Sequence, residues 1–352
     1  MAKRFFCSFS LVSVAFVLVI VAAPLGYAAE TEPYKLAATL KVGGEGGWDY
    51  ATLDDKGERL FLTRTSHTII VDAATGKTLG DIPKSTRTHG VALVPAVKRG
   101  FVSDGKEGGS VTIFDLQTYE VLGKIAAADD ADGIIYDAAS GRVLVSCGDA
   151  NVLIAIAADV DPKAGKADSV ALGGKPEFLV ADGQGRAYVN LTDKNEVVAV
   201  DTKALKVVAR WSTAPGGAPT GLSMDRAKGR LFVGCRNQKM IVMSSKDGSI
   251  LADLPIGVGV DATAFDNGTA LASCADGTLW VIRETAPDKF TTVQTLKTAP
   301  GAKTMAVDGH TGRIYLPTAD MRPAPANGTR PGGRPTPIPG TFKILVVDRT
   351  VQ

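Results

Sequence analysis

The chain is poor in the residues from which metal centres, haem sites and nucleophilic active sites are usually built. Its 352 residues include only three histidines, His67, His89 and His310, and four cysteines. No Cys-x-x-Cys-His, His-Glu-x-x-His or Gly-x-Ser-x-Gly segment occurs, and the glycine-rich stretch at 43–48 lacks the spacing of a phosphate-binding loop. These absences exclude c-type haem attachment, the common zinc-protease motif, the hydrolase nucleophile elbow and a phosphate loop.

The chain also lacks an excess of charge of either sign. Residues 1–28 contain Lys3 and Arg4 and no acidic residue, so the chain after residue 28 has 37 basic and 37 acidic residues. A protein that binds nucleic acid normally carries a basic patch, and a groove for a single strand also needs aromatic side chains. The balance therefore predicts no nucleic-acid partner.

The one long apolar run lies at the N-terminus. Lys3 and Arg4 precede the apolar stretch Phe9–Ala23, and the small-residue sequence Gly-Tyr-Ala ends at Ala28. This order is typical of a secretory signal peptide, and the run is short for a membrane span. We expect residues 1–28 to be removed, leaving 29–352 as a single domain that is periplasmic or secreted and has no stable membrane span.

A strand–turn–strand pattern recurs along the chain. The copy "GERLFLTRTSHTIIVDAATGK" at 57–77 is followed by others that begin at residues 98, 140, 184, 228, 267 and 311. Each copy follows another strand, which usually ends in an aspartate: Asp54, Asp137, Asp182, Asp225, Asp266 and Asp308. After a first gap of 83 residues, which spans two units, the spacings are 45, 43, 41 and 42. A unit of this length with four strands predicts a β-propeller blade.

The two ends of the chain complement each other in this pattern. The seventh unit ends after its third strand, whereas an unmatched strand, "YKLAATLKV", lies at 34–42. We predict an all-β, seven-bladed β-propeller of four-stranded blades, whose ring is closed when the N-terminal strand completes the last blade. Cys147, Cys235 and Cys274 end the second strand of their units, which predicts buried thiols too far apart for disulfides.

Several segments carry a resemblance to a known family. They are "VDAATGKTLGDI", "FDLQTYEVLGKI" and "VDTKALKVVARW", together with the Gly-Arg pairs that open strands. With these segments the sequence resembles the YVTN-repeat, or YncE-like, family of seven-bladed β-propellers, over essentially all of the chain after residue 28. The tetrapeptide that gives the family its name is absent, and "AYVNL" at 187–191 is the nearest match. The resemblance implies the same propeller fold.

Comparison of the repeats places ionisable residues at one mouth of the central channel. The residue that opens the channel-lining strand of each unit belongs to what we call the mouth ring: Asp49, His89, Asp132, Glu177, Thr220, Asp261 and Lys303. Three interpretations stay open. The ring is solvated charge in which Lys303 and His89 neutralise carboxylates, or a divalent-cation site built by four adjacent blades, or a catalytic site with His89 as general base.

Two more features belong to the same mouth. Residues 317–340 contain seven of the 18 prolines, and Arg322, Arg330 and Arg334 outnumber the single acid Asp320. We expect extended, polyproline-like chain here, acting as a lid or partner-binding arm or present only as a tolerated insertion. Trp48 either stacks on a ligand at the mouth or packs between blades.

These observations favour an exported, non-catalytic propeller that binds a ligand or scaffolds a protein through its channel-mouth face. The alternative is an enzyme, a lactonase-like or metal-dependent hydrolase that uses the Asp, His and Glu residues of the ring. A second alternative is an accessory protein of a periplasmic redox enzyme. No residue is assigned as catalytic. The only cofactor that the pattern suggests is a divalent cation, and the expected partner is an unidentified protein or small molecule.

Overall fold

The computed structural model describes residues 1–3, 33–106, 108–322 and 335–350. By its contacts the chain divides into Met1–Thr31 and Glu32–Gln352, and all strands belong to the second unit. The predicted signal peptide, 1–28, therefore falls outside the described residues except for its first three. Among the described residues, no helix is long and apolar enough to cross a membrane.

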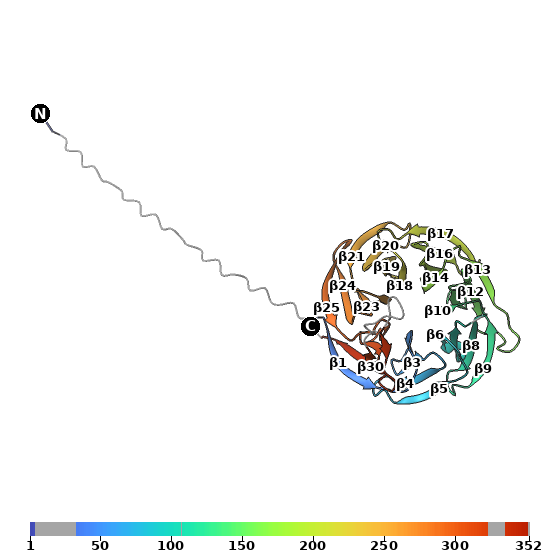
Figure 1. Ribbon diagram of the computed structural model, residues 1–352. Coiled ribbons are helices and arrows are strands. Elements are labelled where there is room, and N and C mark those ends of the chain that lie inside the picture. The colour runs from blue at the N-terminus through green and yellow to red at the C-terminus, as the bar shows by residue number, and fades with distance from the viewer. Residues whose placement is uncertain (4–32, 107, 323–334, 351–352) are drawn as a thin grey trace, which may run out of the picture. The chain divides into compact units, whose positions relative to one another are not determined.

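Seven four-stranded antiparallel sheets form a ring, as the repeats predict (Figure 1). Blade 1 contains β2 (Ala51–Leu53), β3 (Arg59–Thr63), β4 (Thr68–Asp72) and β5 (Thr78–Ile82). Blade 2 contains β6 (Thr88–Val94), β7 (Arg99–Asp104), β8 (Ser110–Asp115) and β9 (Val121–Ala126), with the short 3₁₀ helix η1 (Pro95–Val97) between β6 and β7. Blade 3 contains β10 (Ala131–Asp137), β11 (Arg142–Cys147), β12 (Val152–Ala157) and β13 (Asp168–Ala171).

The remaining blades continue round the ring in chain order. Blade 4 contains β14 (Pro176–Ala181), β15 (Arg186–Leu191), β16 (Glu196–Asp201) and β17 (Lys206–Ser212). Blade 5 contains β18 (Pro219–Asp225), β19 (Arg230–Cys235), β20 (Lys239–Ser244) and β21 (Ile250–Pro255). Blade 6 contains β22 (Val260–Asp266), β23 (Thr269–Cys274), β24 (Thr278–Ala286) and β25 (Lys289–Lys297).

Blade 7 joins the two ends of the chain. Its strands, from the axis outward, are β26 (Ala306–Val307), β27 (Ile314–Thr318), β30 (Lys343–Arg349) and β1 (Tyr34–Lys41). Strand β1 pairs with β30 from Tyr34 opposite Arg349 to Lys41 opposite Lys343, and Figure 1 shows the blue first strand beside the red last one. The predicted closure of the ring by the N-terminal strand is confirmed.

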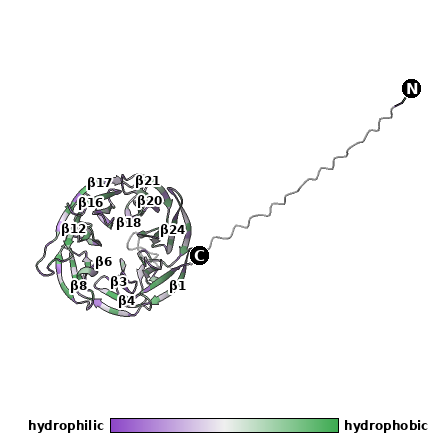
Figure 2. Ribbon diagram, turned by 180° about the vertical axis from the view of Figure 1, so that it is seen from behind, coloured by the Kyte–Doolittle hydropathy of each residue, from purple (hydrophilic) through white to green (hydrophobic). Residues whose placement is uncertain are grey.

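The hydrophobic core is divided among the contacts between neighbouring blades. The described residues form seven buried clusters, and each joins residues of two adjacent blades. Figure 2 shows the matching distribution, with hydrophobic residues along strands all round the ring. Cys147, Cys235 and Cys274 lie buried in these clusters as free thiols. Burial raises the pKa of each thiol to about 12, so the three cysteines act as small apolar residues.

The proline-rich segment departs from the prediction at both of its ends. Pro317 and Thr318, expected in the insertion, belong to strand β27, and Pro317 pairs with Ile344 of β30. Next to it, β28 (Met321–Arg322) forms a short antiparallel ladder with β29 (Thr336–Pro337). The expectation of polyproline-like chain is therefore wrong for these flanks. Arg330 and Arg334 lie outside the described residues.

Candidate functional site

The mouth ring is built at irregular positions of the innermost strands. His89, Asp132, Glu177, Thr220 and Asp261 are each the second residue of their strand, and the register of each of these strands shifts at this point. A bulge of this kind bends the strand and re-aims a side chain. Asp49 and Lys303 lie just before β2 and β26. The repeat thus places the ring residues at equivalent positions, as predicted.

A second set of residues, which the sequence interpretation missed, fixes the backbone of the ring. Ser103 of blade 2 donates to the carbonyl of Asp132 in blade 3 at 2.6 Å, and Thr63 of blade 1 donates to that of His89 in blade 2 at 2.9 Å. The same link from one blade to the next recurs from Ser146 to Glu177, Asn190 to Thr220, Ser273 to Lys303 and Thr304 to Asp49. Except for Thr304, which precedes β26, these donors lie at the last or next-to-last position of the second strand of their blade. This repeated polar residue was the signal for the set.

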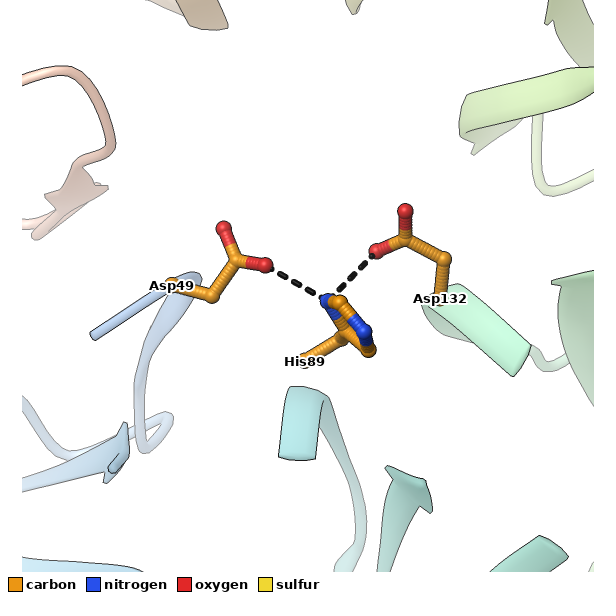
Figure 3. A group of neighbouring side chains, drawn as sticks. All are labelled: Asp49, His89 and Asp132. Carbon is orange, nitrogen blue, oxygen red and sulfur yellow. Dashed lines mark hydrogen bonds and ion pairs between the residues drawn. The ribbon is translucent and has the colours of Figure 1, made fainter. Parts of the chain in front are cut away.

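The ring side chains form a continuous ionic chain over blades 6, 7, 1, 2 and 3. His89 Nδ1 lies 2.7 Å from Asp49 Oδ2 and 3.3 Å from Asp132 Oδ1, as Figure 3 shows. The other oxygen of Asp49 lies 3.6 Å from Lys303 Nζ, which also contacts Asp261. The neutralising role expected for His89 and Lys303 is therefore present.

Glu177 takes part in a separate pair. Its Oε1 accepts a hydrogen bond from Arg236 Nη2 at 3.1 Å, and Arg236 comes from the loop between β19 and β20. The ligand atoms of Asp49, His89 and Asp132 lie within 4.8 Å of one another, and Glu177 is not part of this group. Of the four residues predicted to form one cation site, the structure brings three together.

The ring is far less solvated than the sequence suggested. The side chains of His89, Asp132 and Asp49 are only 10%, 14% and 19% exposed. Burial and the nearby carboxylates hold the pKa of Asp132 well above its usual value, despite the opposing charge of His89. Burial disfavours the charged form of His89, but the hydrogen bond to Asp49 and the charge of Asp132 outweigh it and raise its pKa. The interpretation as freely solvated charge is corrected to a mostly buried ionic network.

The channel is crossed by two aromatic rings next to this network. Tyr50, which follows Asp49, meets Phe178 of blade 4 edge to face, with ring centroids 4.9 Å apart. Blades 1 and 4 are not neighbours, so this contact spans the channel. Burial and then the charges of Asp132 and Asp49 raise the pKa of Tyr50 well above its usual value. The charged groups therefore lie beside an aromatic contact that joins opposite sides of the ring.

Trp48 is held by packing, as one of the two predictions for it required. Its ring lies 5.7 Å from that of Phe342, within the contact between blades 7 and 1. The preceding glycine-rich loop is fixed by Arg64, a side chain buried under Phe342 that donates to the carbonyls of residues 43, 45, 46 and 47. Trp48 is thus a rigid wall residue at the edge of the mouth.

Comparison with known proteins supports the fold of this chain and assigns it to no family. No protein-family model matches it, and no curated protein matches it. Among solved structures it is similar to the β-propeller domain of Cps50 (Swd1) from Myceliophteria thermophila, with 12% sequence identity and a TM-score of 0.68. The match covers 90% of this chain and all of that domain. The likeness shows the β-propeller fold, and the blade count comes from the sheets themselves. Membership of the YVTN-repeat family stays a prediction.

Proposed function

We propose that this protein is an exported, non-catalytic binding module that holds a small ligand or a partner protein at its channel-mouth face. The observation that carries the proposal is the mouth ring itself. Charged side chains from six blades line the mouth, and the backbone carbonyls of five of these residues are fixed by polar side chains of the preceding blades. Burying such groups costs free energy, so they are a candidate site rather than a source of stability.

The orientation of His89 supports binding over catalysis. A histidine that acts as general base uses one nitrogen to contact an orienting carboxylate and the other to take a proton from the substrate. In His89, Nδ1 faces both carboxylates, while Nε2 is buried and has no hydrogen-bond partner in the part of the chain that the structure describes. A Cβ atom placed on Gly105 would lie only 2.9 Å from Nε2. The nitrogen needed for proton transfer therefore faces the protein.

One observation supports the enzyme as a second candidate. The grouping of Asp49, His89 and Asp132 resembles the donor set of a metal-dependent hydrolase, in which the metal rather than His89 would activate water. This candidate predicts hydrolysis of lactone esters after metal loading, lost in His89→Gln. Absence of hydrolysis over a panel of lactones, with and without added metal, supports the binding module.

The exported location rests on the composition of residues 1–28. Fractionation of cells that express the full chain, followed by N-terminal sequencing, tests it directly. A periplasmic or secreted product that begins at Ala29 is expected. A product that keeps Met1 in the cytoplasm would contradict the exported part of the proposal and leave the mouth-face part untouched.

The binding function is tested by charge-reversal substitutions on the two opposite faces of the propeller. Arg236 is half-exposed at the mouth, whereas Lys246 is exposed in the turn between β20 and β21 on the opposite face. Chemical cross-linking to cell-envelope proteins and native mass spectrometry for small ligands are applied to wild type, Arg236→Glu and Lys246→Glu. The expected result is a ligand or partner that Arg236→Glu loses and Lys246→Glu keeps. Loss in Lys246→Glu alone would move the binding face to the other side.

A further inference from the structure

Three potential ligand atoms from adjacent blades converge at one point of the mouth ring. They are Asp49 Oδ2 of blade 1, His89 Nδ1 of blade 2 and Asp132 Oδ1 of blade 3 (Figure 3). All three lie within 4.8 Å of one another. In a tetrahedral zinc site with bonds of about 2.0–2.1 Å, neighbouring ligand atoms lie about 3.3 Å apart. The 3.3 Å between His89 and Asp132 fits this value, and Asp49 at 2.7 Å needs to move back by roughly half an ångström.

One of these atoms has an ion-pair contact with His89 but accepts no hydrogen bond among the described residues. Asp132 Oδ1 is inaccessible to solvent and accepts no hydrogen bond among the described residues, although it points toward His89 Nδ1. A buried carboxylate oxygen without a donor is unfavourable and rare in native structures. Asp49 is the residue that accepts the hydrogen bond from His89. His89 Nδ1 carries one proton and donates it to Asp49, so Asp132 Oδ1 is left without a hydrogen-bond donor where the three side chains meet.

The basic side chains around the three residues supply no further positive charge to Asp132. Lys303 is shared between Asp261 and the outer oxygen of Asp49, and Arg236 belongs to Glu177. Arg87, which lies near His89, is paired with Asp130 at 3.1 Å instead. If His89 binds a metal, it does so as a neutral imidazole, and the two carboxylates are then balanced by one doubly charged cation. No basic side chain in the described part of the chain makes an ion pair with Asp132 apart from His89.

The backbone beneath the three side chains is already fixed. The carbonyls of His89 and Asp132 accept hydrogen bonds from Thr63 and Ser103, and the carbonyl of Asp49 accepts one from Thr304 at 2.8 Å. Preorganisation of this kind lowers the cost of ordering ligands when a metal binds. The site therefore needs side-chain adjustment and no rearrangement of the blades.

We propose that Asp49, His89 and Asp132 bind a divalent first-row transition metal such as Zn²⁺ or Mn²⁺. An imidazole ligand favours these ions over Ca²⁺ and Mg²⁺, which prefer sites made of oxygen atoms alone. Three protein ligands leave at least one coordination position for another donor, as in zinc sites that bind water or substrate. The inference deepens the proposed function and rests on it, since this position supplies an anchor for a carboxylate-bearing ligand at the mouth.

The test uses the chain from Ala29 after removal of bound metal with a chelator. Calorimetric titration with Zn²⁺, Mn²⁺ and Ca²⁺ is expected to show one tight site per chain for Zn²⁺ or Mn²⁺, with at least tenfold weaker binding of Ca²⁺. Asp132→Asn and His89→Gln are expected to weaken the metal at least a hundredfold. Asp149→Asn removes an exposed acid from the same blade as Asp132 and serves as the matched control.

Two further measurements keep the result interpretable. Circular dichroism and melting of each variant without metal verify that the propeller is folded, and Co²⁺ in place of Zn²⁺ reports the ligand geometry through its visible spectrum. Absence of binding by every metal, or equal binding by wild type and Asp132→Asn, overturns the proposal. A folded chain that binds metal but retains no ligand at the mouth refutes the proposed function alone. Capture of a ligand by metal-free protein refutes the role of the metal as the anchor of that ligand.

Discussion

At the scale of single residues, Arg64 shows how a buried charge shapes the mouth. Burial lowers the pKa of its guanidinium to about 10, and the group has carbonyl oxygens rather than a carboxylate as partners. Its carbon Cζ lies 3.8 Å from the centre of the Phe342 ring. The planar fork of arginine satisfies several carbonyls and stacks at the same time. Arg64 therefore fixes the glycine-rich loop that leads to Trp48 and Asp49.

Replacing Arg64 tests this positioning role. Arg64→Lys keeps the charge but cannot reach all four carbonyls or stack in the same way, so it is expected to destabilise folding by about 1–3 kcal/mol. Arg64→Met removes every donor and is expected to cost more. Urea unfolding gives the free energies, and limited proteolysis reports cleavage within 43–48. A lysine variant as stable and as resistant to protease as wild type would show that the loop needs no arginine.

The ring residues themselves could be read from the sequence, whereas the partner of Glu177 could not. Asp49, His89 and Asp132 occur at equivalent positions of a repeat, so strand register alone places them together at the mouth. Arg236 reaches Glu177 from a loop of another blade, and no local pattern encodes that contact. The burial of the ring was also missed, because the contact between Tyr50 and Phe178 joins distant blades.

At the scale of elements, ion pairs link the face of blade 5 to a hairpin of blade 6. Glu284 of β24 lies 2.7 Å from Arg230 Nη1 and 2.5 Å from Lys228 Nζ. Asp288, at the turn after β24, donates its N–H to Glu284 and pairs with Arg230. Hydrogen bonds from Lys228 and Arg230 lower the pKa of Glu284 to about 2. Its charged form is therefore stabilised in the folded state.

Acid titration of stability tests this link. Because the folded pKa of Glu284 lies below the ordinary value of 4.5, its contribution is complete above pH 4.5 and disappears as the pH falls toward 2. Glu284→Gln is expected to melt below wild type at pH 7, and the difference is expected to shrink to nothing near pH 2. Asp253→Asn, which breaks an exposed pair with Lys239, is the control and should change little. A Glu284→Gln effect independent of pH would contradict the assignment.

Most strands were predictable because the repeat supplies seven versions of each one. The exceptions lie in blade 7, where β26 contains only Ala306 and Val307. Beyond Tyr315, strand β27 has a partner on one side alone, which is a position where a sheet tolerates a proline such as Pro317. From composition alone, Pro317 was assigned to the insertion. Its place in a strand depends on pairing with β30, which lies far along the chain and which composition does not reveal.

At the scale of the whole molecule, β1 joins the first and last parts of the chain and removes the exposed edge that β30 would otherwise present. Tyr34 is fully buried against blade 6, and its backbone N–H and carbonyl both bond to the side chain of Gln294 in β25. Its hydroxyl accepts a hydrogen bond from Arg349 of β30 at 3.2 Å. Tyr34 therefore connects β1 both to β30 of its own blade and to β25 of blade 6.

Tyr34 makes several of the contacts that hold β1 in the closed ring. Tyr34→Ala is therefore expected to destabilise the whole propeller by about 3–5 kcal/mol, the usual cost of removing a large buried side chain. Leu36→Ala, in the same strand but 48% exposed, is the matched control and should stay within about 0.5 kcal/mol of wild type. Denaturant unfolding followed by tryptophan fluorescence measures both. If closure is cooperative, Tyr34→Ala shifts the entire transition instead of adding an early step. Equal stability of the two variants would mean that the buried Tyr34 side chain adds nothing to the stability of the closed ring.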